Sequence, residues 1–82
     1  MDMIIKTTGE TITFPHKKFY ELEELQEIVG GYIELVYLPY DGVMVVNEEG
    51  LLLNLPYNPK ASIYAKRPIV GDVLVCKRKH LK

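Results

Sequence analysis

One amphipathic segment with strand-like segments on both sides most constrains the fold of this 82-residue chain. Leu22, Leu25 and Val29 recur at helical spacing, and they predict a helix over residues 19–29 with one apolar stripe. Gly30-Gly31 follows, and glycine readily adopts the left-handed conformation that ends many helices. Because such a stripe must be buried against another element, we expect the helix to cover a sheet.

Short apolar segments separated by turn residues predict the strands of that sheet. They lie at residues 1–7, 11–14, 32–38, 43–46 and 73–76, and the continuous apolar run of the last one predicts a central, buried strand. Pro39-Tyr40-Asp41-Gly42 predicts a tight turn. Asn58-Pro59 is typical of the start of a short helix. Residues 51–55 fit either a short strand or a packed loop.

The predicted order of elements is ββαββ, a short helix and a last strand. This order indicates an α+β fold with about five mostly antiparallel strands and one amphipathic helix packed on one face. A β-grasp-like arrangement and a small barrel-like roll are the candidate topologies. The chain is about half as long as a typical domain, so we expect a single α+β domain over residues 1–76 and a frayed, basic C-terminal tail over residues 77–82.

Charge is strongly segregated along the chain, although the net charge is only -1. Residues 19–59 contain eight acids and no lysine or arginine, whereas residues 60–82 contain seven bases and one acid. If the acids remain together on the folded surface, they would steer a basic partner toward it. A pI near 6.1 argues against a dedicated nucleic-acid-binding domain, which leaves the basic tail as the weakest binding candidate.

No apolar run reaches the ~20 residues that a membrane span needs, and no signal peptide is visible. We therefore expect no membrane association and a location in the cytoplasm of a host cell. Catalysis is not expected either. Ser62 is the only serine and lacks a glycine elbow, and Cys76 lies in an apolar run where it is expected to pack as a small hydrophobe.

His16, His80 and Cys76 are the candidate metal ligands. His80 is four residues from Cys76, but the second closely spaced pair that is typical of a zinc site is missing. We therefore expect no metal and no cofactor.

Six tyrosines and no tryptophan make tyrosine the main candidate for contacts with another molecule. Tyr40 at the predicted hairpin tip and Tyr57 in a proline-flanked loop are the expected anchors. The acids expected to bind the same protein partner are Glu23, Glu24, Glu27, Glu48 and Glu49. The alternative is a homo-oligomer that binds a nucleotide-like ligand through Tyr57, Asn58, Lys60, Lys66 and Arg67.

Four stretches together resemble a family of small proteins of unknown function from phages, plasmids and integrated mobile elements. They are LQEIVGGYIE at 25–34, VVNEEG at 45–50, LPYNPKA at 55–61 and IVGDVLV at 69–75, and the resemblance covers about residues 20–76. It implies an accessory protein of a mobile element and provides no catalytic residues. The leading hypothesis is a non-enzymatic protein that binds a host protein stoichiometrically, such as an inhibitor of a defence or regulatory factor.

Overall fold

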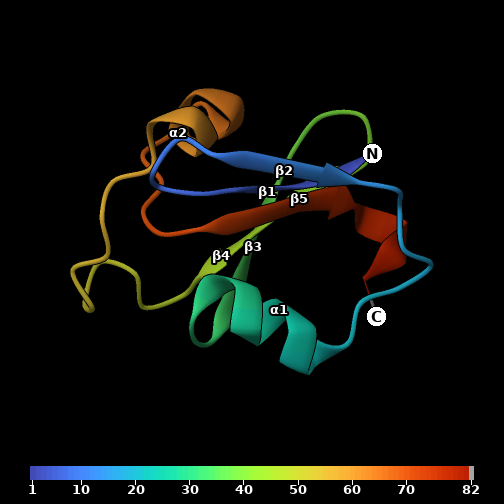
Figure 1. Ribbon diagram of the computed structural model, residues 1–82, viewed down its shortest axis with the longest axis horizontal. Coiled ribbons are helices and arrows are strands. Elements are labelled where there is room, and N and C mark those ends of the chain that lie inside the picture. The colour runs from blue at the N-terminus through green and yellow to red at the C-terminus, as the bar shows by residue number, and fades with distance from the viewer. Residues whose placement is uncertain (82) are drawn as a thin grey trace.

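The computed structural model describes residues 1–81 and contains one five-stranded sheet with a helix on each face (Figure 1). The elements are β1 (Asp2–Ile5), β2 (Thr11–Phe14), α1 (Leu22–Val29), β3 (Ile33–Tyr37), β4 (Gly42–Asn47), α2 (Pro59–Ala65), β5 (Val73–Lys77) and a 3-10 turn (Arg78–His80). The strand order across the sheet is β2-β1-β5-β4-β3, and all four pairings are antiparallel. The predicted α+β class is confirmed.

The sheet is open, with β2 and β3 at its two edges. The barrel-like roll is therefore wrong as a topology. The first and last strands, β1 and β5, are paired antiparallel, whereas a β-grasp fold pairs its first and last strands in parallel. The β-grasp-like topology is therefore wrong as well. β5 lies in the middle of the sheet, as its apolar run predicts, and its residues from Val73 to Cys76 are all buried.

Alternation along the strands divides the core into two layers, one on each face of the sheet. Val43 and Val45 of β4 pack with Leu25 of α1 on one face. Met44 of the same strand packs with Ala61 of α2 on the other face. Because the two helices cover opposite faces, the central strands are buried on both sides, which explains why they lack polar alternation.

Helix α1 begins at Leu22, three residues later than predicted. The carboxylate of Glu24 accepts a hydrogen bond from the backbone N–H of Glu21 at 3.0 Å, which places the helix start there. Gly30 has a φ of 83° and ends the helix, as predicted. Upstream of the helix, Tyr20 is held by the C-terminal segment, since its N–H donates to the carbonyl of His80 at 3.0 Å.

Helix α2 is positioned by Asn58, which is fully buried. Its Oδ1 accepts a hydrogen bond from the N–H of Ala61 at 3.0 Å and forms the predicted N-cap. Its Nδ2 donates to the carbonyls of Ile5 at 3.0 Å and Gly71 at 2.9 Å. This one side chain therefore joins α2, the end of β1 and the turn that leads into β5.

The C-terminal segment is not the frayed tail that its composition predicts. Arg78–His80 form the 3-10 turn, and Leu81 forms a parallel bridge with Tyr20 and packs against the core on the α1 face. The segment 78–81 is thus part of the folded domain, because the apolar side chain of Leu81 packs on the core. The basic residues around Leu81 made the segment look like a solvated tail in the sequence. Lys82 lies outside the described residues.

Candidate partner-binding surface

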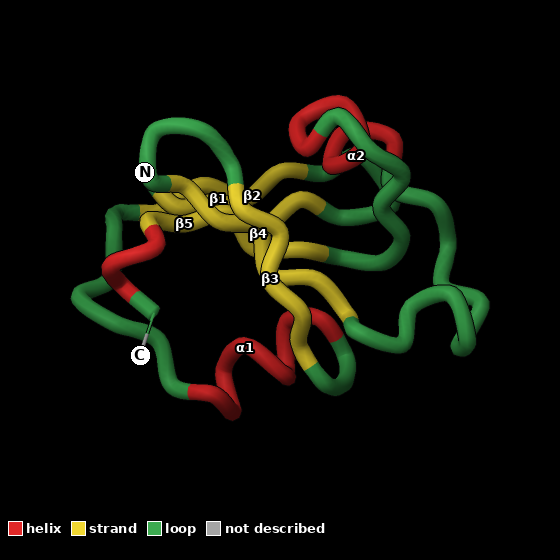
Figure 2. Tube along the Cα trace, turned by 180° about the vertical axis from the view of Figure 1, so that it is seen from behind, coloured by secondary structure: helices red, strands yellow, loops and turns green. Residues whose placement is uncertain are grey.

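The segment between β4 and α2 extends away from the sheet at one end of the molecule (Figures 1 and 2). Asn47 anchors its start, since Nδ2 donates to the carbonyl of Val29 at 3.0 Å and Oδ1 accepts from the N–H of Glu49 at 2.7 Å. The N–H of Leu55 closes the loop by donating to the carbonyl of Gly50 at 3.0 Å. These bonds give the tip of the loop a defined backbone.

Three consecutive leucines at this tip face solvent. Leu51 and Leu52 are each 82% exposed, and Leu53 is 52% exposed. Neither a short strand nor a packed loop would expose all three, so both sequence interpretations of residues 51–53 are wrong. Contiguous exposed apolar groups are uncommon on soluble monomers and mark sites of interaction with other molecules.

Carboxylates surround a depression at the base of the same loop. Glu34, Glu48 and Glu49 line it, with Arg67 as the single base among its lining residues. The depression has a volume of about 410 Å³, and its apolar lining includes Val36, Val46 and Ile69. We call the three carboxylates and the three leucines the loop-end surface. It combines apolar side chains with a net negative rim.

The structure separates the five predicted partner-binding acids into two groups. Glu48 and Glu49 belong to the loop-end surface, whereas the other three lie on α1. Glu23 and Glu27 are exposed there. Glu24 is half-exposed, and its hydrogen bond from Lys17 holds the pKa of its carboxyl below the usual value.

Among residues 1–81, none of the acids forms an ion pair with a C-terminal base. Within residues 1–81 the ion pairs are Lys17 with Glu24 and His16 with Asp2. The Arg78–His80 turn (red in Figure 1) lies at the opposite end of the molecule from the projecting loop (yellow). The acids of the loop and the bases of this turn therefore lie apart after folding. The separation is incomplete, because Arg67 lines the depression beside Glu48 and Asp41 lies next to Arg78.

The two predicted tyrosine anchors lie at different ends of β4. Tyr57 is 56% exposed and forms a bridge with Val70, a residue that lines the depression beside Glu48. Tyr40 is 94% exposed in the β3–β4 turn. The six residues of β4 separate it from Glu48, which corresponds to about 20 Å of extended chain. Tyr57 thus adjoins the loop-end surface, whereas Tyr40 does not.

Within one chain, the residues predicted for a nucleotide-like ligand are spread from one end of α2 to the other. Asn58 is buried with all its polar groups bonded within the protein, and Lys60 donates to the carbonyl of Gly9 and the hydroxyl of Thr11. Lys66 and Arg67 follow the other end of the seven-residue helix α2, about 10 Å away. An Asn-Pro pair signals a helix cap equally well, so the sequence could not exclude this outcome.

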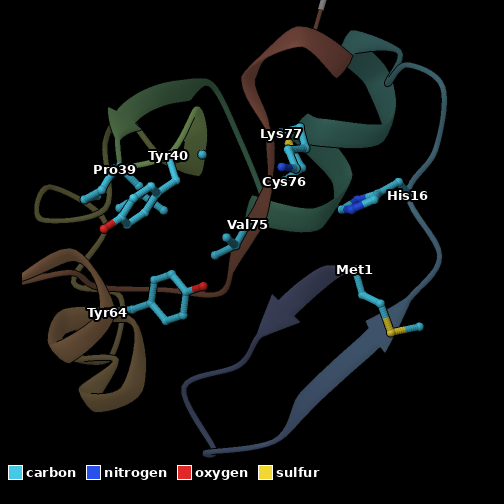
Figure 3. Close-up of a pocket in the computed structure, with 10 residues that line it drawn as sticks. Met1, His16, Pro39, Tyr40, Tyr64, Val75, Cys76 and Lys77 are labelled. Atoms are coloured by element: carbon cyan, nitrogen blue, oxygen red, sulfur yellow. The ribbon is translucent and has the colours of Figure 1, made fainter.

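A second hollow of about 410 Å³ lies beside the β3–β4 turn. Tyr40 and Tyr64 lie on one side of it, and His16 and Lys77 lie on the other (Figure 3). These two tyrosines come from separate elements, and no local sequence signal connects them, so their pairing was not predicted.

A buried polar cluster adjoins this hollow and was also missed. Asp2 is fully buried and is bonded to the hydroxyl of Tyr20 and to Nδ1 of His16. Burial alone would raise the pKa of Asp2, but the hydrogen bonds from Tyr20, His16 and the N–H of Lys17 outweigh it and hold this pKa below its usual value. The sequence contained one signal of this cluster. Asp2 lies two residues from Ile4, so both side chains are on the same face of β1, the face that packs toward α1.

These observations define a small, open-sheet α+β domain with an apolar and acidic surface at one end. The chain belongs to the family described as domain of unknown function DUF3846, which matches residues 1–80. This confirms the predicted membership of a family of unknown function, and the origin in phages or mobile elements stays a prediction. No curated protein and no solved structure matches the chain. Among residues 1–81, no helix has the length and apolar character needed to cross a bilayer.

Proposed function

We propose that this protein binds another protein stoichiometrically through the loop-end surface and catalyses no reaction. In this proposal it is an accessory protein of a phage or mobile element in the host cytoplasm, and its target is a host defence or regulatory factor. The exposure of Leu51, Leu52 and Leu53 on one anchored loop is the observation that carries the proposal. The carboxylates of Glu34, Glu48 and Glu49 beside them, with Arg67 as the one base in the same depression, support it.

The two kinds of side chain would have different effects on binding. Burying an exposed leucine in a partner contributes about 1.5–3 kcal/mol, so the leucines would mainly determine how slowly the complex dissociates. The carboxylates of Glu34, Glu48 and Glu49 would mainly accelerate association with a basic surface. The expected target site is therefore an apolar cleft flanked by lysine or arginine.

The test begins with capture of the target from host lysate by the tagged protein and its identification by mass spectrometry. The purified target is then titrated by calorimetry, and one-to-one binding is expected. The double variant Leu51→Ser/Leu52→Ser should weaken binding about 100-fold or more, since two buried leucines are lost. Ile63→Ser is the matched control, because Ile63 is 78% exposed on α2, away from the loop.

Charge reversal tests the electrostatic part of the proposal separately. Glu48→Lys/Glu49→Lys should slow association and remove most of its dependence on salt. The corresponding α1 variant, Glu23→Lys/Glu27→Lys, shows whether the helix acids contribute. Equal affinity in the wild-type protein and in both loop variants would contradict the proposal.

A second candidate function, binding of a nucleotide-like ligand by a homo-oligomer, is favoured by the hollow shown in Figure 3. Its volume is within the usual range for ligand sites, and tyrosine rings can stack on a base. A ligand bound there should raise the melting temperature by mass action, and Tyr64→Ala should abolish the increase. The absence of any shift across a nucleotide panel would count against this function.

A further inference from the structure

Two histidines and one carboxylate from distant parts of the chain meet beside the N-terminal end of β1. Asp2, His16 and His80 each place one potential ligand atom within 4.8 Å of the other two. The sequence offers both histidines, together with Cys76, as candidate metal ligands. The structure instead groups them with Asp2, which comes from a strand and carries no metal-binding signal in the sequence.

The carboxylate of Asp2 is oriented in the way that metal-ligating carboxylates usually are. Its Oδ2 accepts hydrogen bonds from the hydroxyl of Tyr20 and, at 3.4 Å, from the N–H of Lys17. Its Oδ1 accepts a hydrogen bond from Nδ1 of His16, so an ion bound between these two atoms would replace that proton. Tyr20 is only 3% exposed, so the carboxylate cannot turn freely. Such outer contacts on Oδ2 fix a ligand, and Oδ1 becomes the metal-binding oxygen once the proton that it shares with His16 is released.

His80 provides an independent observation. Its Nδ1 is buried and has no hydrogen-bond partner among residues 1–81. Buried polar atoms almost always have a partner, so this nitrogen is available to coordinate a bound ion. The His80 ring packs edge-on against the His16 ring with 5.6 Å between the ring centroids. This contact keeps the two imidazoles close enough to bind one ion.

We propose that Asp2, His16 and His80 form a binding site for a divalent transition metal ion, with Zn²⁺ as the best match. Two imidazole nitrogens and one carboxylate oxygen are a common three-ligand set for zinc, and water completes the coordination. Cys76 is buried but lies outside this ligand group. The bound ion would connect β1 directly to the C-terminal segment.

The experiment uses the full chain without a histidine tag, stripped of metal with a chelator. Titration with Zn²⁺ by calorimetry should show one site, and Co²⁺ should give the intense visible absorption of a tetrahedral site. At a free Zn²⁺ concentration about 100 times the Kd, the melting temperature should rise by about 10 °C or more, because the ion binds only the folded chain.

Variants locate the site. His16→Gln and His80→Gln should each weaken Zn²⁺ binding at least tenfold and abolish the Co²⁺ absorption. Tyr20→Phe, which removes only the outer contact, should weaken binding about tenfold. Cys76→Ala is the matched control, because it removes a residue type that often binds zinc but lies outside this ligand group. It should bind Zn²⁺ like the wild-type protein.

Circular dichroism checks that each variant is folded. His16 is exposed, so its variant keeps the test decisive even if His80→Gln unfolds. The proposal is overturned by the absence of one-to-one binding, by undiminished binding in His16→Gln, or by loss of binding in Cys76→Ala.

Discussion

Replacing Asn58 tests whether this side chain stabilises the fold as a junction or only as a helix cap. In Asn58→Ala, the N–H of Ala61 loses its acceptor and the carbonyls of Ile5 and Gly71 lose their donor. Loss of an N-cap costs about 0.5–2 kcal/mol, and each buried carbonyl left unpaired costs about 1–3 kcal/mol. The free energy of unfolding should therefore fall by roughly 3–6 kcal/mol, a large part of the total for an 82-residue domain.

Asn58→Asp separates the two roles. Aspartate is a good N-cap residue, so a protein in which only the cap matters would tolerate it. In this structure the new oxygen would instead face the carbonyls of Ile5 and Gly71 at about 3 Å. We expect Asn58→Asp to be less stable than Asn58→Ala at pH 7, because a buried charge then lies beside two acceptors.

The assay is urea unfolding monitored by circular dichroism at pH 7 and at pH 5. The stability of Asn58→Asp should partly recover at the lower pH, where the protonated carboxyl can donate one hydrogen bond. Asn54→Asp is the control, because Asn54 is exposed in a turn and the same change of charge should alter stability by less than about 0.5 kcal/mol. An Asn58→Asp protein as stable as the wild type would refute the reasoning.

Three further predictions follow from burial and backbone geometry. Burial raises the pKa of the Cys76 thiol to about 12, so a thiol reagent at pH 8 should modify it only after unfolding in urea. Gly71→Ala should lower the melting temperature more than Gly30→Ala. Both glycines have a positive φ, but only at Gly71 would the new Cβ lie 2.8 Å from Leu55 Cδ1. Equal losses in the two variants would contradict this prediction. Leu74→Ala, in the centre of the sheet, should lower the free energy of unfolding by about 2–5 kcal/mol in urea, and a loss below 1 kcal/mol would contradict the observed core.

Local pattern predicted the elements well because each signal lies within a few residues. The helical stripe of α1, the Gly30 cap, the Asn58 cap and the central position of β5 were all found in this way. Strand order was not predictable, since apolar strands are interchangeable until tertiary packing selects their neighbours. The start of α1 was missed because Tyr20 bonds to the C-terminal segment rather than to the helix.

The candidate sites were harder to predict, because they depend on exposure and on contacts between distant residues. Leu51–Leu53 have the same composition as a buried strand, and only the structure shows that they face solvent. Asp2, His16 and His80 come from the two ends of the chain and the loop after β2, so no spacing rule connects them. Asp2 beside Ile4 on one face of β1 was a clue to a buried polar group, but not to a metal ligand.

The place of β5 between β1 and β4 has a consequence for how this chain folds during synthesis. The β1–β2 and β3–β4 hairpins are each formed from neighbouring residues. Among residues 1–81 they share no strand pairing with each other, and within the sheet β5 alone connects them. Until that strand leaves the ribosome, two half-sheets with unpaired inner edges must coexist on one nascent chain. Completion of the sheet is thus a late, long-range event, which is the kind of step that sets a slow folding rate.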